Sequence, residues 1–188
     1  MSEVPPIEPM LDDGELPGWP PVVGITSICW GVLGLLCNGC GVASPLLIGM
    51  VPQNPQMGPM PDIMKPGIGQ VSLAGIGLAM SVLLIIAGVA TLQRQFAGRM
   101  LHLAWAGINL VLTVVGVAIA IKTINDQMAW KAANPDNLWA KQMNPFFSYI
   151  GIAIAVLLGG AWPVFCLVWF GLIKKTAESF TRNPLPAE

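Results

Sequence analysis

The chain has 188 residues and a formal net charge of −1, and 54% of its residues are hydrophobic while only 10% are charged. Soluble domains carry about 25% charged residues, so this composition favours a protein embedded in lipid. The near-zero net charge argues against nucleic acid as a partner, since phosphate binding requires clustered Lys and Arg. The four cysteines do not form the disulfide framework of a small secreted scaffold.

Residues 1–21 are rich in proline and acidic side chains. Such a segment cannot build a hydrophobic core, so we expect a disordered tail. Trp19, near its end, fits the aromatic belt at a membrane interface.

Four apolar segments without Asp, Glu, Lys or Arg follow, at residues of about 22–50, 71–92, 100–121 and 146–173. Each reaches or exceeds the roughly 20 residues that cross about 30 Å of hydrocarbon as a helix. They lack the polar stripe of a soluble helix and the alternation of a transmembrane strand. The sequence therefore predicts an all-α integral membrane protein, with four transmembrane helices in an antiparallel bundle over residues 22–173.

Basic residues indicate the orientation of this bundle. Arg94 and Arg99 lie in the short second loop, and Lys174 and Lys175 directly follow the fourth segment. Basic residues close to the membrane favour the cytoplasmic side. We therefore expect a multi-pass protein of the cell membrane with both termini cytoplasmic, residues 174–188 forming the second tail.

The loop after the first segment contains Met57, Met60 and Met64. Thioethers are soft ligands that suit Cu(I), and this spacing resembles the methionine clusters of copper-handling membrane proteins over fewer than ten residues. The resemblance implies Cu(I) handling or small-solute transport. The alternative is a stiff extended loop whose methionines rest on the membrane surface.

The loop between the third and fourth segments is predicted to hold a short interfacial helix. Asn125 or Asp126 can cap it, and Pro135 would end it before a further turn. Trp130 and Trp139 are expected to anchor this loop in the interface. The alternative is a partner-binding surface, because tryptophan is favoured in interaction hot spots.

Cys37 and Cys40 lie within the first apolar segment, in the stretch CNGC. The motif and the span count resemble membrane thiol oxidases that generate disulfides beside a quinone, which implies a redox role for the pair. A helix would have to unwind to join the two sulfurs, and no neighbouring base or cation favours the thiolate. The preferred interpretation is that both cysteines are small packing residues.

Small residues recur four positions apart in the other segments, a spacing that lets helix backbones approach closely in lipid. The candidates are Gly75 with Ala79, Gly77 with Ser81, Gly116 with Ala120, and the series Gly151, Ala155 and Gly159. Asn109 is expected to form a hydrogen bond across helices. Pro163 is expected to kink the fourth helix, because it leaves the carbonyl of Gly159 without its usual donor.

No convergent set of His, Glu or Lys marks an enzyme, and no phosphate-binding or nucleotide fingerprint is present. The sequence predicts a non-catalytic accessory or scaffold subunit without a cofactor, packed against helices of other membrane subunits or of its own copies. A thiol–disulfide oxidoreductase using Cys37 and Cys40 and a Cu(I)-handling or transport protein are the alternatives. In layout the chain is similar to many small bacterial four-span proteins with a Pro-rich cytosolic head, a similarity that carries no functional residues.

Overall fold

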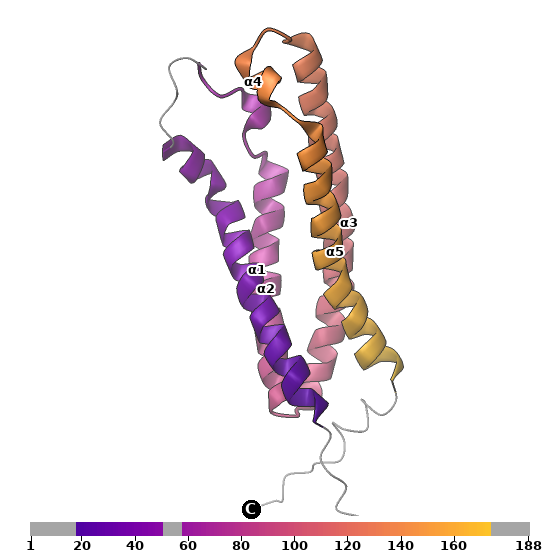
Figure 1. Ribbon diagram of the computed structural model, residues 1–188. Coiled ribbons are helices and arrows are strands. Elements are labelled where there is room, and N and C mark those ends of the chain that lie inside the picture. The colour runs from indigo at the N-terminus through magenta and orange to yellow at the C-terminus, as the bar shows by residue number, and fades with distance from the viewer. Residues whose placement is uncertain (1–17, 51–57, 174–188) are drawn as a thin grey trace, which may run out of the picture.

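The computed structural model describes residues 18–50 and 58–173, and every regular element in these ranges is a helix (Figure 1). Four helical stretches are long and apolar enough to cross a membrane. They contain the helices α1 (Trp19–Met50), α2 (Ile68–Leu92), α3 (Phe96–Ala133) and α5 (Pro145–Cys166), with α5 continuing as the π-helical turn η2 (Leu167–Leu172). The predicted all-helical fold with four span-length helices is confirmed, whereas most of both predicted tails lies outside the described residues.

Several helix boundaries differ from those predicted. α2 begins at Ile68 rather than near residue 71, and α3 begins at Phe96 rather than near residue 100. α1 begins at Trp19 rather than near residue 22, because Pro20 and Pro21 occupy its first turn, where proline is tolerated. α3 runs without interruption to Ala133, so the predicted break after Ile121 was wrong. No glycine or proline interrupts residues 122–133, and prolines and glycines are what usually end a helix.

The short helix of the third loop is instead α4 (Leu138–Gln142). The side chain of Asn137 caps it by accepting a hydrogen bond of 2.9 Å from the Trp139 backbone N–H. Lys131 Nζ donates to the Met143 carbonyl at 2.7 Å, which holds the end of α4 against α3. Asn144 then caps α5, with Pro145 in its first turn, as the Asn-Pro dipeptide suggests.

α1 and α2 pack along a seam of small residues, which we call the glycine seam. Facing positions run in opposite order along the two helices: Gly24 with Gly88, Gly31 with Ser81, and Gly41 with Ala74. A Cβ added to Gly24 would lie 2.9 Å from the Gly88 carbonyl oxygen, and one added to Gly88 would lie 2.8 Å from that of Gly24. Glycine at both positions is therefore what allows the two backbones to touch.

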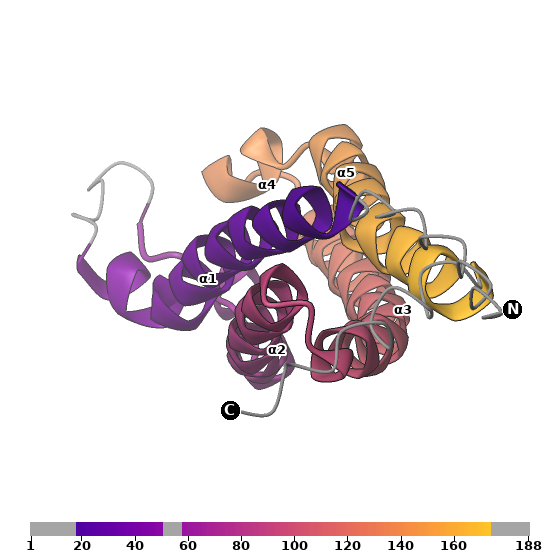
Figure 2. The same cartoon turned by 90° about the horizontal axis from the view of Figure 1, so that it is seen from below.

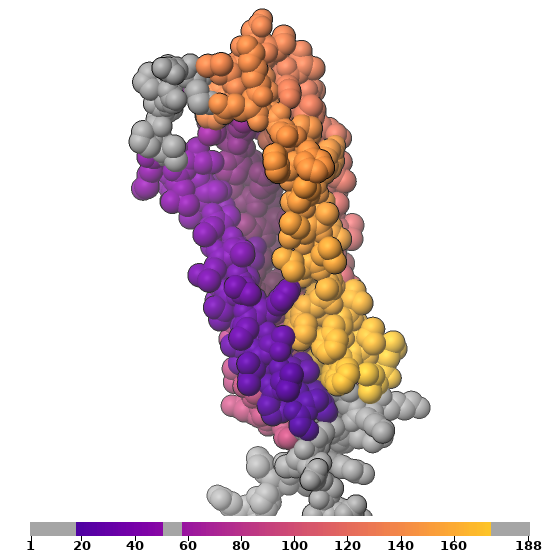
Figure 3. Space-filling view, viewed as in Figure 1, coloured from indigo at the N-terminus to yellow at the C-terminus, as the bar shows by residue number. Residues whose placement is uncertain are grey.

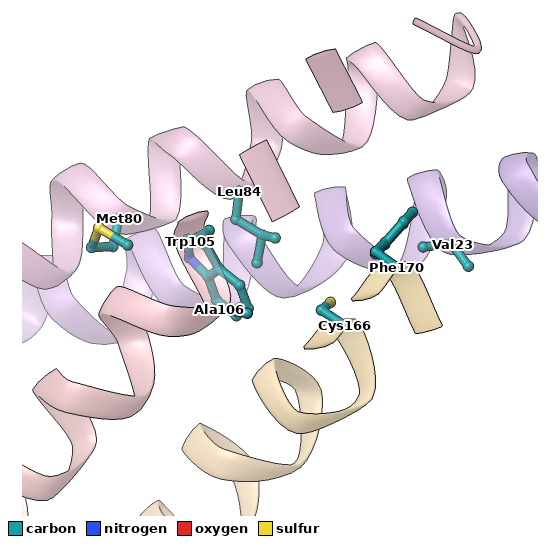
Figure 4. Packing of buried hydrophobic residues seen from close by; sticks show 7 residues of the cluster. All are labelled: Val23, Met80, Leu84, Trp105, Ala106, Cys166 and Phe170. Atoms are coloured by element: carbon teal, nitrogen blue, oxygen red, sulfur yellow. The ribbon is translucent and has the colours of Figure 1, made fainter. Parts of the chain in front are cut away.

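The hydrophobic core lies at the end of the bundle where α1 begins, α2 turns into α3, and η2 ends. Its buried members are Val23, Met80, Leu84, Trp105, Ala106, Cys166 and Phe170 (Figure 4). At this end α1 leans across toward α5, as the view along the bundle shows (Figure 2). Most other large apolar side chains of α1, α2, α3 and α5 are exposed on the outside.

A buried polar cluster links three elements at this same end. The His102 ring has Nδ1 2.7 Å from the Gly98 carbonyl and Nε2 2.7 Å from the Ser27 hydroxyl. If Nδ1–H donates to the carbonyl, Nε2 accepts from Ser27. The ring also stacks on Phe170, with centroids 4.7 Å apart. Arg99 Nε donates to the Phe170 carbonyl at 2.9 Å, so α1, α3 and η2 are held together.

Replacing Gly88 by leucine tests the glycine seam. The new side chain has no room beside the Gly24 carbonyl, and overpacking of this kind costs about 1–3 kcal/mol. We expect Gly88→Leu to lower the free energy of unfolding by this amount, measured by tryptophan fluorescence during SDS titration in mixed micelles. Gly75→Leu is the matched control, since a Cβ there meets no heavy atom within 4 Å. Equal losses for both variants would contradict the seam.

Candidate functional site

A cleft lies between α1 and α5. It extends from the core toward the end of the bundle opposite to the start of α1. α1 packs on α2, α2 on α3 and α3 on α5, but α1 and α5 share no comparable interface. The space between them is a cavity of about 610 Å³, visible as a hollow between the two helices (Figure 3). The cleft is therefore bounded by all four long helices and open on one side.

Aromatic side chains close the cleft toward the core. Trp30 of α1 and Trp105 of α3 line the cavity. Trp30 packs against Trp162 of α5 with ring centroids 6.2 Å apart, and Trp19 contacts Trp169 at 6.0 Å. These contacts bring α1 and α5 together at one end, so the separation of the two helices is confined to the other.

The lining of the cavity is mostly apolar and, among the residues that the structure describes, includes no charged side chain. Its polar members are Cys37, Asn38, Ser81 and Asn109. The hydroxyl of Ser81 donates to the Gly77 carbonyl at 2.8 Å within its own helix. The two asparagines thus provide the main hydrogen-bonding groups of the cleft.

Asn109 joins α3 to α5. Its Nδ2 donates to the Gly159 carbonyl at 3.1 Å. That carbonyl lies four residues before Pro163, whose ring removes the N–H that would normally bond to it. The expected cross-helix bond of Asn109 and the expected effect of Pro163 therefore meet at a single carbonyl. α5 bends in its C-terminal half (Figure 1).

Asn38 lies on the opposite wall, formed by α1 and α2. Its Nδ2 donates to the Gly34 carbonyl at 2.8 Å, and its side chain packs directly over Gly77, where a Cβ would overlap it. Asn38 was not among the site residues predicted from the sequence. Asn38 is an amide side chain within an uncharged segment of the sequence, and this same feature indicated Asn109.

The structure places the candidate cysteines on an unbroken helix. Cys37 and Cys40 are both free and exposed, and only Cys37 lines the cleft. α1 contains no His, Lys, Arg, Asp or Glu that would serve as a base or cation beside them. Because the helix is not unwound between them, the arrangement provides no preformed disulfide site.

The candidate methionines are separated. Met57 lies outside the described residues. Met64 lines a cavity of about 200 Å³ together with Met128 of α3 and Met143, which precedes α5, whereas Met60 does not line it. Over residues 18–50 and 58–173, no group of three His, Cys, Asp or Glu side chains is placed to hold a metal ion.

The candidate packing residues fall into two groups. Gly77 and Ser81 face Asn38 and Gly34 of α1, while Gly116 and Gly159 face neighbouring side chains at 3.1 and 3.5 Å, measured from an added Cβ. The others do not face a helix closely: Gly75, Ala79 and Gly151 are exposed, Ala120 is half-buried, and Ala155 lines the cleft. The glycine seam uses a spacing of seven, visible in Gly24 and Gly31 and in Ala74, Ser81 and Gly88, which a search for spacings of four overlooks.

The three tryptophans that were predicted to lie at the membrane interface differ in their contacts and burial. Trp19 is part of the aromatic contacts between α1 and η2. Trp130 near the end of α3 and Trp139 in α4 are half-buried, and the indole N–H of Trp139 has no acceptor among the described residues. Neither lines the cleft.

No protein-family model, no curated protein and no solved structure matches this chain. The function is therefore inferred from the cleft itself. The cleft can hold an uncharged, largely apolar group and offers it two amides, but it contains no nucleophile paired with a base.

A double-mutant cycle tests the link between Asn109 and Pro163. Asn109→Leu leaves the Gly159 carbonyl without a donor, and an unsatisfied buried acceptor costs about 1–3 kcal/mol. In a Pro163→Ala background, the restored backbone N–H can bond to that carbonyl instead. We expect a clearly smaller loss of unfolding free energy for Asn109→Leu there, with a coupling of about 1–2 kcal/mol in SDS titrations. An identical loss in both backgrounds would show that the two residues act independently.

Proposed function

We propose that this chain is a non-catalytic accessory protein of the cell membrane, which holds an apolar element of the bilayer in the α1–α5 cleft. In this proposal the four long helices form an antiparallel transmembrane bundle with both termini in the cytoplasm. Arg94 and Arg99 support that orientation, since they lie at the α2–α3 turn, the same end as the start of α1. The mostly apolar exterior of the helices is suited to hydrocarbon rather than to water.

The observation that carries the proposal is the open cleft. Closely packed helices fill their shared space with side chains, yet here a cavity of about 610 Å³ remains among four helices and opens sideways. In a membrane this opening would face the acyl chains, so an occupant can come from within the bilayer. The lack of charged or paired catalytic groups in the lining favours binding over chemistry.

Photo-crosslinking from the two faces of α5 tests this function. Benzoylphenylalanine at Leu158, which lines the cleft, should give a discrete crosslinked product in native membranes, identified by mass spectrometry as a protein or a lipid. The same probe at Leu157, which is 68% exposed and does not line the cleft, is the matched control. Only diffuse labelling of bulk lipid from both positions would contradict a specific occupant.

The thiol–disulfide alternative is not supported by the geometry, because Cys37 and Cys40 lie on an intact helix without a base. If both serve as packing residues, Cys37→Ser combined with Cys40→Ser should leave folding and the Leu158 crosslink unchanged.

Cu(I) handling remains a second candidate because of one observation. Met64, Met128 and Met143, from three separate segments, line one small cavity, and thioethers are suitable Cu(I) ligands. This set differs from the one expected from sequence, since only Met64 is common to both.

A Cu(I) titration with a competing chelator distinguishes the two sets. If the cavity binds copper, Met128→Leu should abolish a stoichiometric site, whereas Met60→Leu should leave it intact. Retention of binding in Met128→Leu would exclude this cavity, and absence of binding in the unmodified chain would exclude the second candidate.

A further inference from the structure

We propose that the occupant of the α1–α5 cleft is one uncharged lipid with a long hydrocarbon tail and a hydrogen-bonding oxygen. This chemistry is shared by prenyl quinones and prenyl alcohols. The inference rests on the proposed function and names the ligand class of that same cleft.

The volume of the cleft is that of a small-molecule site. The cavity of about 610 Å³ falls within the range of roughly 300–1,000 Å³ that is typical of such sites.

The lining selects against charge. Burying an ionised group without a partner is far costlier than burying a neutral polar one, and none of the described residues around the cavity is charged. A phospholipid headgroup or a nucleotide would therefore be excluded. Trp30 and Trp105 contribute aromatic rings to the lining, which suit an apolar ring or an unsaturated chain.

The two asparagines argue for an oxygen on the ligand. Each amide has two N–H groups and one Oδ1, and each uses a single N–H, toward Gly34 or Gly159. The described residues provide no partner for the remaining N–H and the Oδ1 of either amide. A plain hydrocarbon would leave these groups unsatisfied at about 1–3 kcal/mol each. A ligand carbonyl oxygen can accept from the free N–H groups, and a ligand hydroxyl can in addition donate to an Oδ1.

The amides are also close enough in height to serve one ligand. Asn38 lies over Gly77 of α2, and Leu73, one turn away on α2, packs on Gly116 of α3. Counting 1.5 Å per residue from these contacts places Asn109 and Asn38 about 5 Å apart along the bundle. They come from opposite walls, so a head group between Trp30 and the amides would meet both walls. The tail would leave through the open side into the bilayer.

Native mass spectrometry of the full chain in detergent micelles tests the inference. The probes are decylubiquinone, geranylgeraniol and, as a reference without oxygen, hexadecane. We expect saturable binding of one molecule per chain for at least one oxygen-bearing probe, at least tenfold tighter than for hexadecane. Binding of only the quinone or only the alcohol would identify which of the two ligand classes the cleft prefers.

Three variants locate the binding. Ala155→Phe fills the cleft from α5 and should abolish binding, while Val156→Phe, on an exposed position outside the lining, should not. Asn38→Leu should weaken the oxygen-bearing probes about tenfold and leave hexadecane unchanged. Among the residues that the structure describes, the Asn38 side chain forms its one hydrogen bond within α1, so this variant removes no bond between helices and should fold normally, as thermal unfolding would verify.

The inference is overturned if hexadecane binds as tightly as both other probes, or if Ala155→Phe retains binding. If a protein is crosslinked at Leu158 in membranes and no lipid binds, the inference of a lipid ligand is overturned, but the proposed accessory function is not. If there is neither a discrete crosslink at Leu158 nor lipid binding, both the proposed function and the inferred ligand class are contradicted.

Discussion

The structure depends on one constraint: a backbone group that is freed inside an apolar helix and kept from water must find a hydrogen-bond partner within the chain. Two prolines, Pro45 in α1 and Pro163 in α5, each remove a donor from the carbonyl four residues earlier. The Gly41 carbonyl receives a local bond of 2.7 Å from Ser44, but the Gly159 carbonyl receives one of 3.1 Å from Asn109 on another helix. The first solution affects α1 alone, whereas the second fixes α5 to α3. This bond adds to the packing of α5 on α3.

The same bundle is therefore closed at one end and open at the other. At the closed end, three kinds of contact coincide: the glycine seam of α1 and α2, the tryptophan contacts between α1 and α5, and the buried hydrogen bonds of His102. Each joins α1 to a different element, so α1 is held there from several directions. At the other end α1 keeps only its seam with α2. The cleft exists because the contacts that bring α1 and α5 together end at Trp30.

The sequence was sufficient for features that depend on one segment at a time. Uncharged length predicts the four helices, and the dipeptide Asn144-Pro145 marks the start of α5. It was insufficient for features that depend on which helices meet. The spacing of four identified Gly77 and Gly116 but also the exposed Gly75 and Gly151, because periodicity shows which residues share a face but not what that face contacts. The end of α3 was misplaced because Asn125 and Asp126 can cap a helix, yet nothing in residues 122–133 forces one to stop. Asn38 was not predicted as a site residue, because the side of an uncharged helix that lines a cleft is decided by its packing against other helices.

The two walls of the cleft differ in how firmly they are held. On the α1–α2 wall, Asn38 sits over Gly77 within a seam where backbone touches backbone, so its amide has little freedom to move. On the α3–α5 wall, α5 packs along α3, and the Asn109 amide bonds to the Gly159 carbonyl four residues before a proline that interrupts the helix. An occupant thus meets one surface built on a backbone seam and one that includes a side-chain hydrogen bond between its two helices. Since Asn109 belongs both to that bond and to the lining, any group that competes for its amide acts directly on one of the contacts between α3 and α5.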